Sequence, residues 1–123
     1  MATRLVHLAH DAQDPARLAR FWSAALGWRI ALEKAGVVAI CPHGYAYPEP
    51  GAVPLVFVAV PGAKAGQNRV HLHLATSSAA HQQELTEHLI GLGASRADIG
   101  QGGGPWVVLT DPEGTHFCVL TPC

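Results

Sequence analysis

Residues 5–27 read LVHLAHDAQDPARLARFWSAALG, and this stretch carries the pattern that decides the fold. Its first six residues, 5–10, alternate as a β-strand does, with His7 on one face. Asp14 suits a helix N-cap, the proline after it suits the first helical position, and apolar residues then recur at helical spacing until Gly27. The stretch therefore predicts a strand followed by a helix.

A second stretch, VHLHLATSSAAHQQELTEHLIGLG at residues 70–93, repeats this order. The final glycine follows His7 by 20 residues in the first stretch and His71 by 22 residues in the second. Each half then ends in a strand-like segment before a proline, LVFVAVP around Phe57 and HFCVLTP around Phe117. These spacings favour an internal repeat, and chance similarity between short apolar strings is the alternative.

The repeat predicts two β-α-β-β-β modules, residues 1–61 and 70–123, joined by a connector at residues 62–69. In the second module we expect the first strand at residues 70–75 and the helix at residues 78–92. The further strands are expected at residues 28–32, 37–41 and 55–60 in the first module and at 95–99, 106–110 and 116–120 in the second. The fold class is therefore α+β.

Composition excludes several classes of function. The formal charge is −1, which argues against a nucleic-acid partner and against a polybasic membrane surface. No apolar run approaches the length of a membrane span, and the start of the chain lacks a secretory signal, so we expect a cytoplasmic protein. Three cysteines do not make a disulfide framework. No phosphate-binding loop or serine nucleophile motif occurs, so we expect no nucleotide cofactor.

Eight histidines are the chemically informative residues. Strand alternation places His71 and His73 on one face of their strand, and His116 and Cys118 on one face of the last strand. With His7, five groups can then converge, because imidazole and thiolate both offer a lone pair near neutral pH. Three interpretations stay open at this point: a metal site, a metal-free polar pocket, and simple packing.

The strings DPARLARFW, NRVHL and DPEGTHFCVL, in this order, resemble the glyoxalase, bleomycin-resistance and extradiol-dioxygenase group, the vicinal oxygen chelate superfamily. Within it the chain looks like the compact glyoxalase-like domain proteins. The resemblance covers nearly the whole chain and implies one domain over residues 1–123. It also implies that the two modules form a curved, cup-like mixed sheet around a small-molecule site, frequently completed across a homodimer.

The resemblance further implies a divalent metal held by His7, His71 and Cys118. Metalloenzymes of the superfamily commonly carry Glu at the third position, so Cys118 departs from the pattern. A thiolate favours Zn or another soft ion over Mg or Mn. We expect Zn, Ni, Mn or Fe if a metal binds.

The remaining site predictions concern proton transfer and the pocket wall. His73 and His116 are the predicted catalytic residues, which move a proton on the substrate. Phe57 and Val58 are predicted to line the substrate pocket, as is Trp106, for which a place in the core is the alternative.

Three functions follow from these predictions. The first is a small-molecule enzyme of lyase, isomerase or dioxygenase type that is metal-dependent. The second, which the resemblance to bleomycin-resistance proteins implies, is a metal-free protein that sequesters a drug or metabolite. The third is an α+β dimer whose role is to bind another protein.

Overall fold

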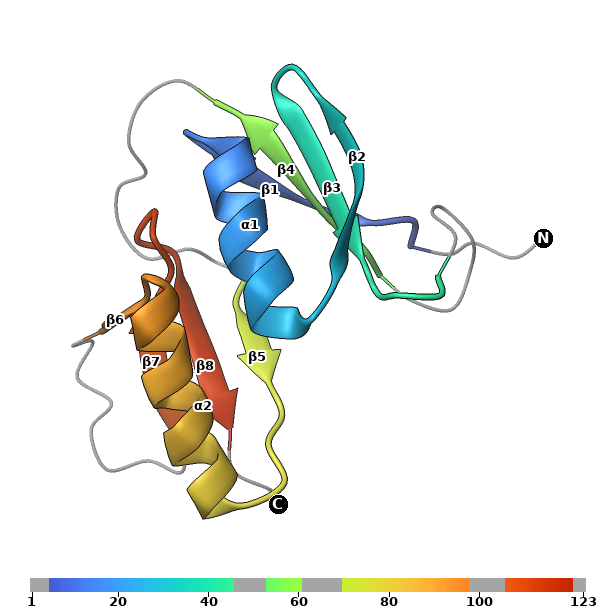
Figure 1. Cartoon of the computed structure of the whole chain (residues 1–123). Helices are drawn as coiled ribbons and strands as arrows, with labels where there is room; N and C mark the ends of the chain where they lie inside the picture. The colour runs from blue at the N-terminus through green and yellow to red at the C-terminus, as the bar shows by residue number, and fades with distance from the viewer. Residues whose placement is uncertain (1–4, 46–52, 61–69, 98–105, 121–123) are drawn as a thin grey trace. The chain divides into compact units, whose positions relative to one another are not determined.

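The computed structural model describes residues 5–45, 53–60, 70–97 and 106–120. The chain divides into two compact units, Met1–Ala63 and Lys64–Cys123, each with one helix and one four-stranded sheet among its described residues (Figure 1). The elements in chain order are β1 (Leu8–Ala12), α1 (Pro15–Leu26), β2 (Arg29–Lys34), β3 (Val37–Cys41), β4 (Leu55–Ala59), β5 (Leu72–Leu74), α2 (Ala79–Leu92), β6 (Ser95–Arg96), β7 (Trp106–Thr110) and β8 (His116–Leu120). This is the predicted β-α-β-β-β order, twice.

The first helix begins and ends at the residues that the sequence predicts. The side chain of Asp14 accepts a hydrogen bond from the backbone N–H of Arg17, and the proline after Asp14 occupies the first turn. At the other end Gly27 has φ 68°, a left-handed conformation that costs glycine little. Between these caps Leu18 and Trp22 are fully buried. Helix α1 therefore presents one apolar stripe to its sheet.

The first sheet has the order β1-β4-β3-β2, with β1 parallel to β4 and the other pairs antiparallel. Residues paired across neighbouring strands point to the same face. Ile40 and Phe57 share one such face with Val38 and Leu55, and both are 0 % exposed. Side chains of this size need a cover to be fully buried, and within this module α1 lies across β3 and β4 (Figure 1). We therefore assign this face to the helix.

The second module repeats the arrangement with the order β5-β8-β7-β6. Ser78 caps α2 by accepting a hydrogen bond from the backbone N–H of His81 at 3.0 Å. On the sheet, Leu109, Phe117 and Val119 are at most 1 % exposed, and register places all three on one face. The Gln82 side chain of α2 donates to the carbonyl oxygen of Val119 at 2.9 Å, so the helix lies against this part of β8.

The turn between β7 and β8 follows the predicted tight-turn chemistry. Asp111 Oδ1 accepts the backbone N–H groups of Glu113 at 2.9 Å and Thr115 at 3.0 Å. Gly114 has φ 85° and its N–H donates to the Asp111 carbonyl oxygen. Asp111 is 3 % exposed, so these bonds satisfy a carboxylate that lies almost out of water.

The structure differs from the prediction in where pairing begins. The first strand starts at Leu8 rather than at residue 5, because β1 pairs only with β4, whose register begins at Leu55. The pairing register also corrects the alignment of the two halves: Leu55 lies opposite Leu8 as Phe117 lies opposite Leu72, so the equivalent of Phe117 is Leu55 and not Phe57. The shift is two residues, so the faces are unchanged.

Some predictions fall outside the described residues. These are the connector at residues 62–69, the centre of the loop after β3, and the end of the strand expected at residues 95–99, of which β6 is the described part. No helix in the described part of the chain is long and apolar enough to cross a membrane.

Candidate functional site

The second sheet carries the predicted imidazoles and thiol on one face. His73 of β5 pairs in register with Cys118 of β8, and Cys118 pairs with Val108 of β7 on its other side. His116 is two residues from Cys118 on the same strand and pairs with Thr110. These residues alternate with the buried residues that face α2. The face opposite α2 therefore brings His73, His116 and Cys118 together, as the alternation predicted.

The three groups differ in exposure. His73 is exposed, whereas His116 is half-buried and its Nδ1 atom is buried. Cys118 is 7 % exposed, and this burial raises the pKa of its thiol above the ordinary value. The thiol is therefore neutral at pH 7, when it is a weak nucleophile and a weak ligand. His73 is the group of the three that a ligand or solvent reaches most easily.

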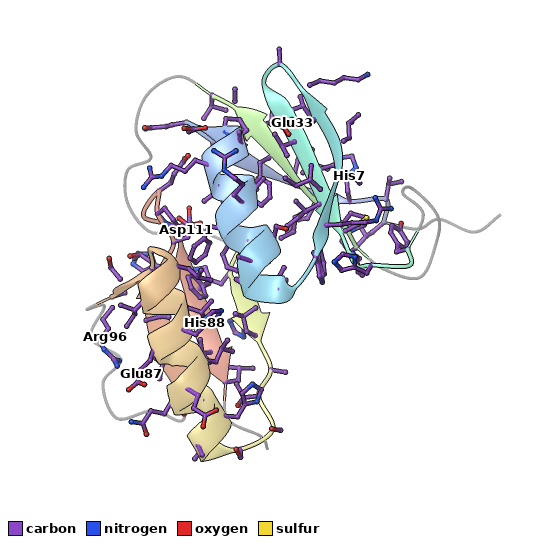
Figure 2. All side chains as sticks on the ribbon, in the orientation of Figure 1. His7, Glu33, Glu87, His88, Arg96 and Asp111 are labelled. Atoms are coloured by element: carbon purple, nitrogen blue, oxygen red, sulfur yellow. The ribbon has the colours of Figure 1, made fainter. Side chains whose placement is uncertain are left out.

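The two remaining predicted metal ligands lie at equivalent places in the two modules. His71 is half-buried and directly precedes β5. His7, which is labelled in Figure 2, is exposed and directly precedes β1. Residues two apart share a side in an extended chain, so we expect His71 to share the face of His73. Within either module, the described residues include no group of three or more His, Cys, Asp or Glu side chains that can hold a metal ion. The set of His7, His71 and Cys118 takes its residues from both modules.

Strand geometry separates the two pocket residues predicted on β4. Phe57 pairs with His10, and their ring centroids are 5.5 Å apart on the face assigned to α1. Val58 pairs with Asp11, is half-buried and lies on the opposite face. One face cannot carry both residues. Phe57 therefore belongs to the core of the first module, and Val58 keeps its place as a predicted pocket residue.

Trp106 is the third predicted pocket residue. It begins β7, and its backbone lies opposite Leu120 of β8. Its side chain is outside the part of the chain that the structure describes. The choice between cavity wall and core stays a prediction for this residue.

Sequence reasoning missed a polar cluster at one end of the first sheet. Arg29 of β2 pairs with Cys41 of β3, and its Nη2 atom donates to the carbonyl oxygen of Tyr45 at 2.7 Å. The Sγ atom of Cys41 lies 3.8 Å from the same oxygen. The available signal was an arginine on a short strand between apolar residues, which is also typical of a solvated edge position.

A family model described as a glyoxalase-like domain matches residues 7–120. The chain belongs to this glyoxalase-like domain family. No curated protein sequence matches it. The family and the repeated β-α-β-β-β order agree with the resemblance to the vicinal oxygen chelate superfamily.

Solved structures resemble the chain over almost its whole length. One is a glyoxalase/bleomycin resistance protein/dioxygenase family enzyme from Burkholderia phytofirmans PsJN, with 15 % identity, 95 % of this chain and 97 % of that chain covered, and a TM-score of 0.69. Another is a fosfomycin resistance protein from Mesorhizobium loti, with 14 % identity, coverage of 100 % and 94 %, and a TM-score of 0.69. A third is a glyoxalase-related enzyme from Fulvimarina pelagi, with 16 % identity, coverage of 96 % and 87 %, and a TM-score of 0.68. At these identities the likeness concerns the fold, and it confirms the predicted α+β class.

Proposed function

We propose that this glyoxalase-like protein binds a small molecule against the face of the second sheet that lies opposite α2, and that it acts on this molecule as an enzyme of lyase, isomerase or dioxygenase type. The observation that supports the proposal is the register of β5 and β8. It puts His73 and His116, whose imidazoles can carry a proton between substrate atoms, on one face with Cys118.

The residues of this face have different roles in the proposal. His73 is exposed, so its imidazole can take a proton from a bound substrate and return it. His116 is half-buried and is the second candidate for this task. Cys118 holds a neutral thiol because burial raises its pKa, so in the metal-free protein it lines the site rather than attacking the substrate.

The resemblance implies that His7, His71 and Cys118 would hold a divalent metal, and the proposal keeps this set as a hypothesis. Two imidazole nitrogens and one sulfur suit Zn or another soft ion better than Mg or Mn. When bound, such a metal polarises an oxygen atom of the substrate. Because the thiol of Cys118 is neutral at pH 7, its proton must leave before the sulfur can serve as a ligand, and metal affinity should therefore rise with pH.

Metal analysis tests this proposal. The protein is purified without a histidine tag, and Zn, Ni, Mn and Fe are measured in wild type, His7→Ala and His71→Ala, before and after reconstitution. We expect about one equivalent in wild type and at least a tenfold weaker affinity in either variant. His81→Ala is the matched control, since His81 is exposed on α2 and outside the ligand set. Equal, near-zero metal in all four proteins would refute the metal site.

Metal-free sequestration of a drug or metabolite is the second candidate function. Two observations favour it: the neutral thiol of Cys118, and its apolar register partner Val108 on the same face of the second sheet. A sequestering site needs shape and apolar walls rather than proton transfer. Calorimetry with bleomycin and with fosfomycin distinguishes the two functions. Binding that persists in the metal-free protein and in His73→Ala supports sequestration, and binding lost in both supports the enzyme.

We further propose that the protein is a homodimer. Strand β2 ends the first sheet, contains a register shift between Ile30 and Leu32, and leaves these two side chains 38 % and 36 % exposed. Exposed apolar side chains on an edge strand favour association with a second copy, which removes them from water. Light scattering over a dilution series should give twice the monomer mass for wild type and a lower mass for Ile30→Lys. A monomeric wild type at every concentration would contradict the proposal.

A further inference from the structure

Arg29 differs from every other described basic side chain. It is half-buried, whereas the others are exposed: Arg17, Arg20, Lys34 and Arg96. Removing part of a guanidinium from water costs free energy unless hydrogen bonds or a counter-charge compensate it. What Arg29 contacts therefore indicates what this end of the first sheet binds.

One hydrogen bond anchors the guanidinium. Its Nη2 atom donates to the carbonyl oxygen of Tyr45, and the same oxygen lies 3.8 Å from Cys41 Sγ. Register pairs Arg29 with Cys41, so both side chains are on the same face of the sheet. Cys41 alternates with Ile40, which is on the face assigned to α1. The Arg29 side chain is therefore on the face opposite the helix, with Val56 and Val58.

On the described strands of the first sheet, no carboxylate neighbours Arg29 on its own face. A guanidinium has five N–H donors, and the bond to Tyr45 uses one of them. The acidic residue of β1 on the same face is Asp11, which pairs with Val58, and Val58 pairs with Val37 of β3. Val37 is four residues from Cys41 along β3, a separation of about 13 Å. Glu33 pairs with Val38 and faces the other side.

We propose that Arg29 binds the anionic group of a small molecule, a carboxylate or a phosphoryl or phosphonate group, at the face of the first sheet opposite α1. This anion site uses residues of the first module alone and goes beyond the function proposed for the second sheet. The guanidinium N–H groups that do not bond Tyr45 can donate side by side to two oxygen atoms of such a group. Partial burial strengthens this pairing, because water screens it less than at an exposed site.

Nuclear magnetic resonance of the arginine Nε–Hε groups tests the proposal in the wild-type protein. Inorganic phosphate and, separately, acetate are titrated at constant ionic strength set with sodium chloride. We expect the Arg29 resonance to shift and saturate at millimolar anion, while those of Arg17 and Arg20 shift weakly and without saturation. The two titrations identify whether a tetrahedral or a planar anion is preferred. A shift at Arg29 no larger than that at Arg20 would overturn the proposal.

Variants of Arg29 distinguish the effect of its positive charge from the effect of its planar guanidinium geometry. Arg29→Lys keeps the positive charge and can still donate to the Tyr45 carbonyl, so its amide spectrum should show an intact fold while phosphate affinity falls about tenfold. Arg29→Gln should remove saturable phosphate binding, and Arg20→Gln, on the exposed side of α1, should leave it unchanged. Phosphate binding in Arg29→Gln as tight as in wild type would refute the assignment.

The outcome is independent of the metal and proton-transfer proposals. Saturation of Arg29 by phosphate in a protein that binds no metal would leave the anion site in place and remove the metal site. Normal metal content with no response at Arg29 would keep the metal site and remove the anion site.

Discussion

Replacing Phe57 by Ala tests the division of β4 into a core face and a site face. Phe57 is 0 % exposed and lies in ring contact with His10 on the face assigned to α1. Truncating a fully buried phenylalanine removes its burial energy and leaves a cavity, which costs about 4 kcal/mol. Val58 is half-buried on the opposite face, so Val58→Ala should cost about 1 kcal/mol.

The assay is urea unfolding followed by tryptophan fluorescence, to which the fully buried Trp22 of the same module contributes. With a slope of about 2 kcal/mol per molar urea, the Phe57→Ala midpoint should fall by about 2 M and the Val58→Ala midpoint by about 0.5 M. Phe57→Leu is the matched control and should lose about 1 kcal/mol, because it retains most of the buried volume. A loss below about 1.5 kcal/mol for Phe57→Ala, or a larger loss for Val58→Ala, would show that Phe57 lines a cavity rather than the core.

Three further predictions concern the second module. Burial raises the pKa of Cys118, so the contribution of its neutral thiol to stability is fully present below the ordinary thiol pKa and is lost as pH rises through the higher folded value. Wild type should therefore lose stability above about pH 8.5 in urea melts. Cys118→Ala should lose less stability over the same pH range. Cys118→Glu should move metal preference from Zn toward Mn, measured by mass spectrometry after reconstitution with an equimolar mixture, and an unchanged preference would remove Cys118 from the ligand set. Asp111→Ala should cost about 2 kcal/mol, because a buried and a part-buried backbone N–H group lose their acceptor. Asp111→Asn keeps the acceptor oxygen and should cost less than half as much in the same melts.

Much of this protein could be predicted from local chemistry. Asp14 and Gly27 mark the ends of α1 because capping and left-handed backbone depend on the residue at that position and its near neighbours. The same holds for the turn at Asp111 and Gly114. Alternation placed His116 and Cys118 on one face of β8, because side-chain direction in a strand has period two whatever pairs with it.

Only the tertiary structure decided which strands pair and at which residue. Pairing with β4 begins β1 at Leu8, and it makes Leu55 rather than Phe57 the counterpart of Phe117. Pairing also assigned Phe57 to the helix side of its sheet and Val58 to the other, a choice that depends on which face the helix covers. The anchoring of Arg29 by Tyr45, 16 residues away, has no periodic signal in the sequence. Periodicity reports the direction of a side chain along its own strand, whereas burial and hydrogen-bond partners depend on residues distant in the chain, which only folding brings together.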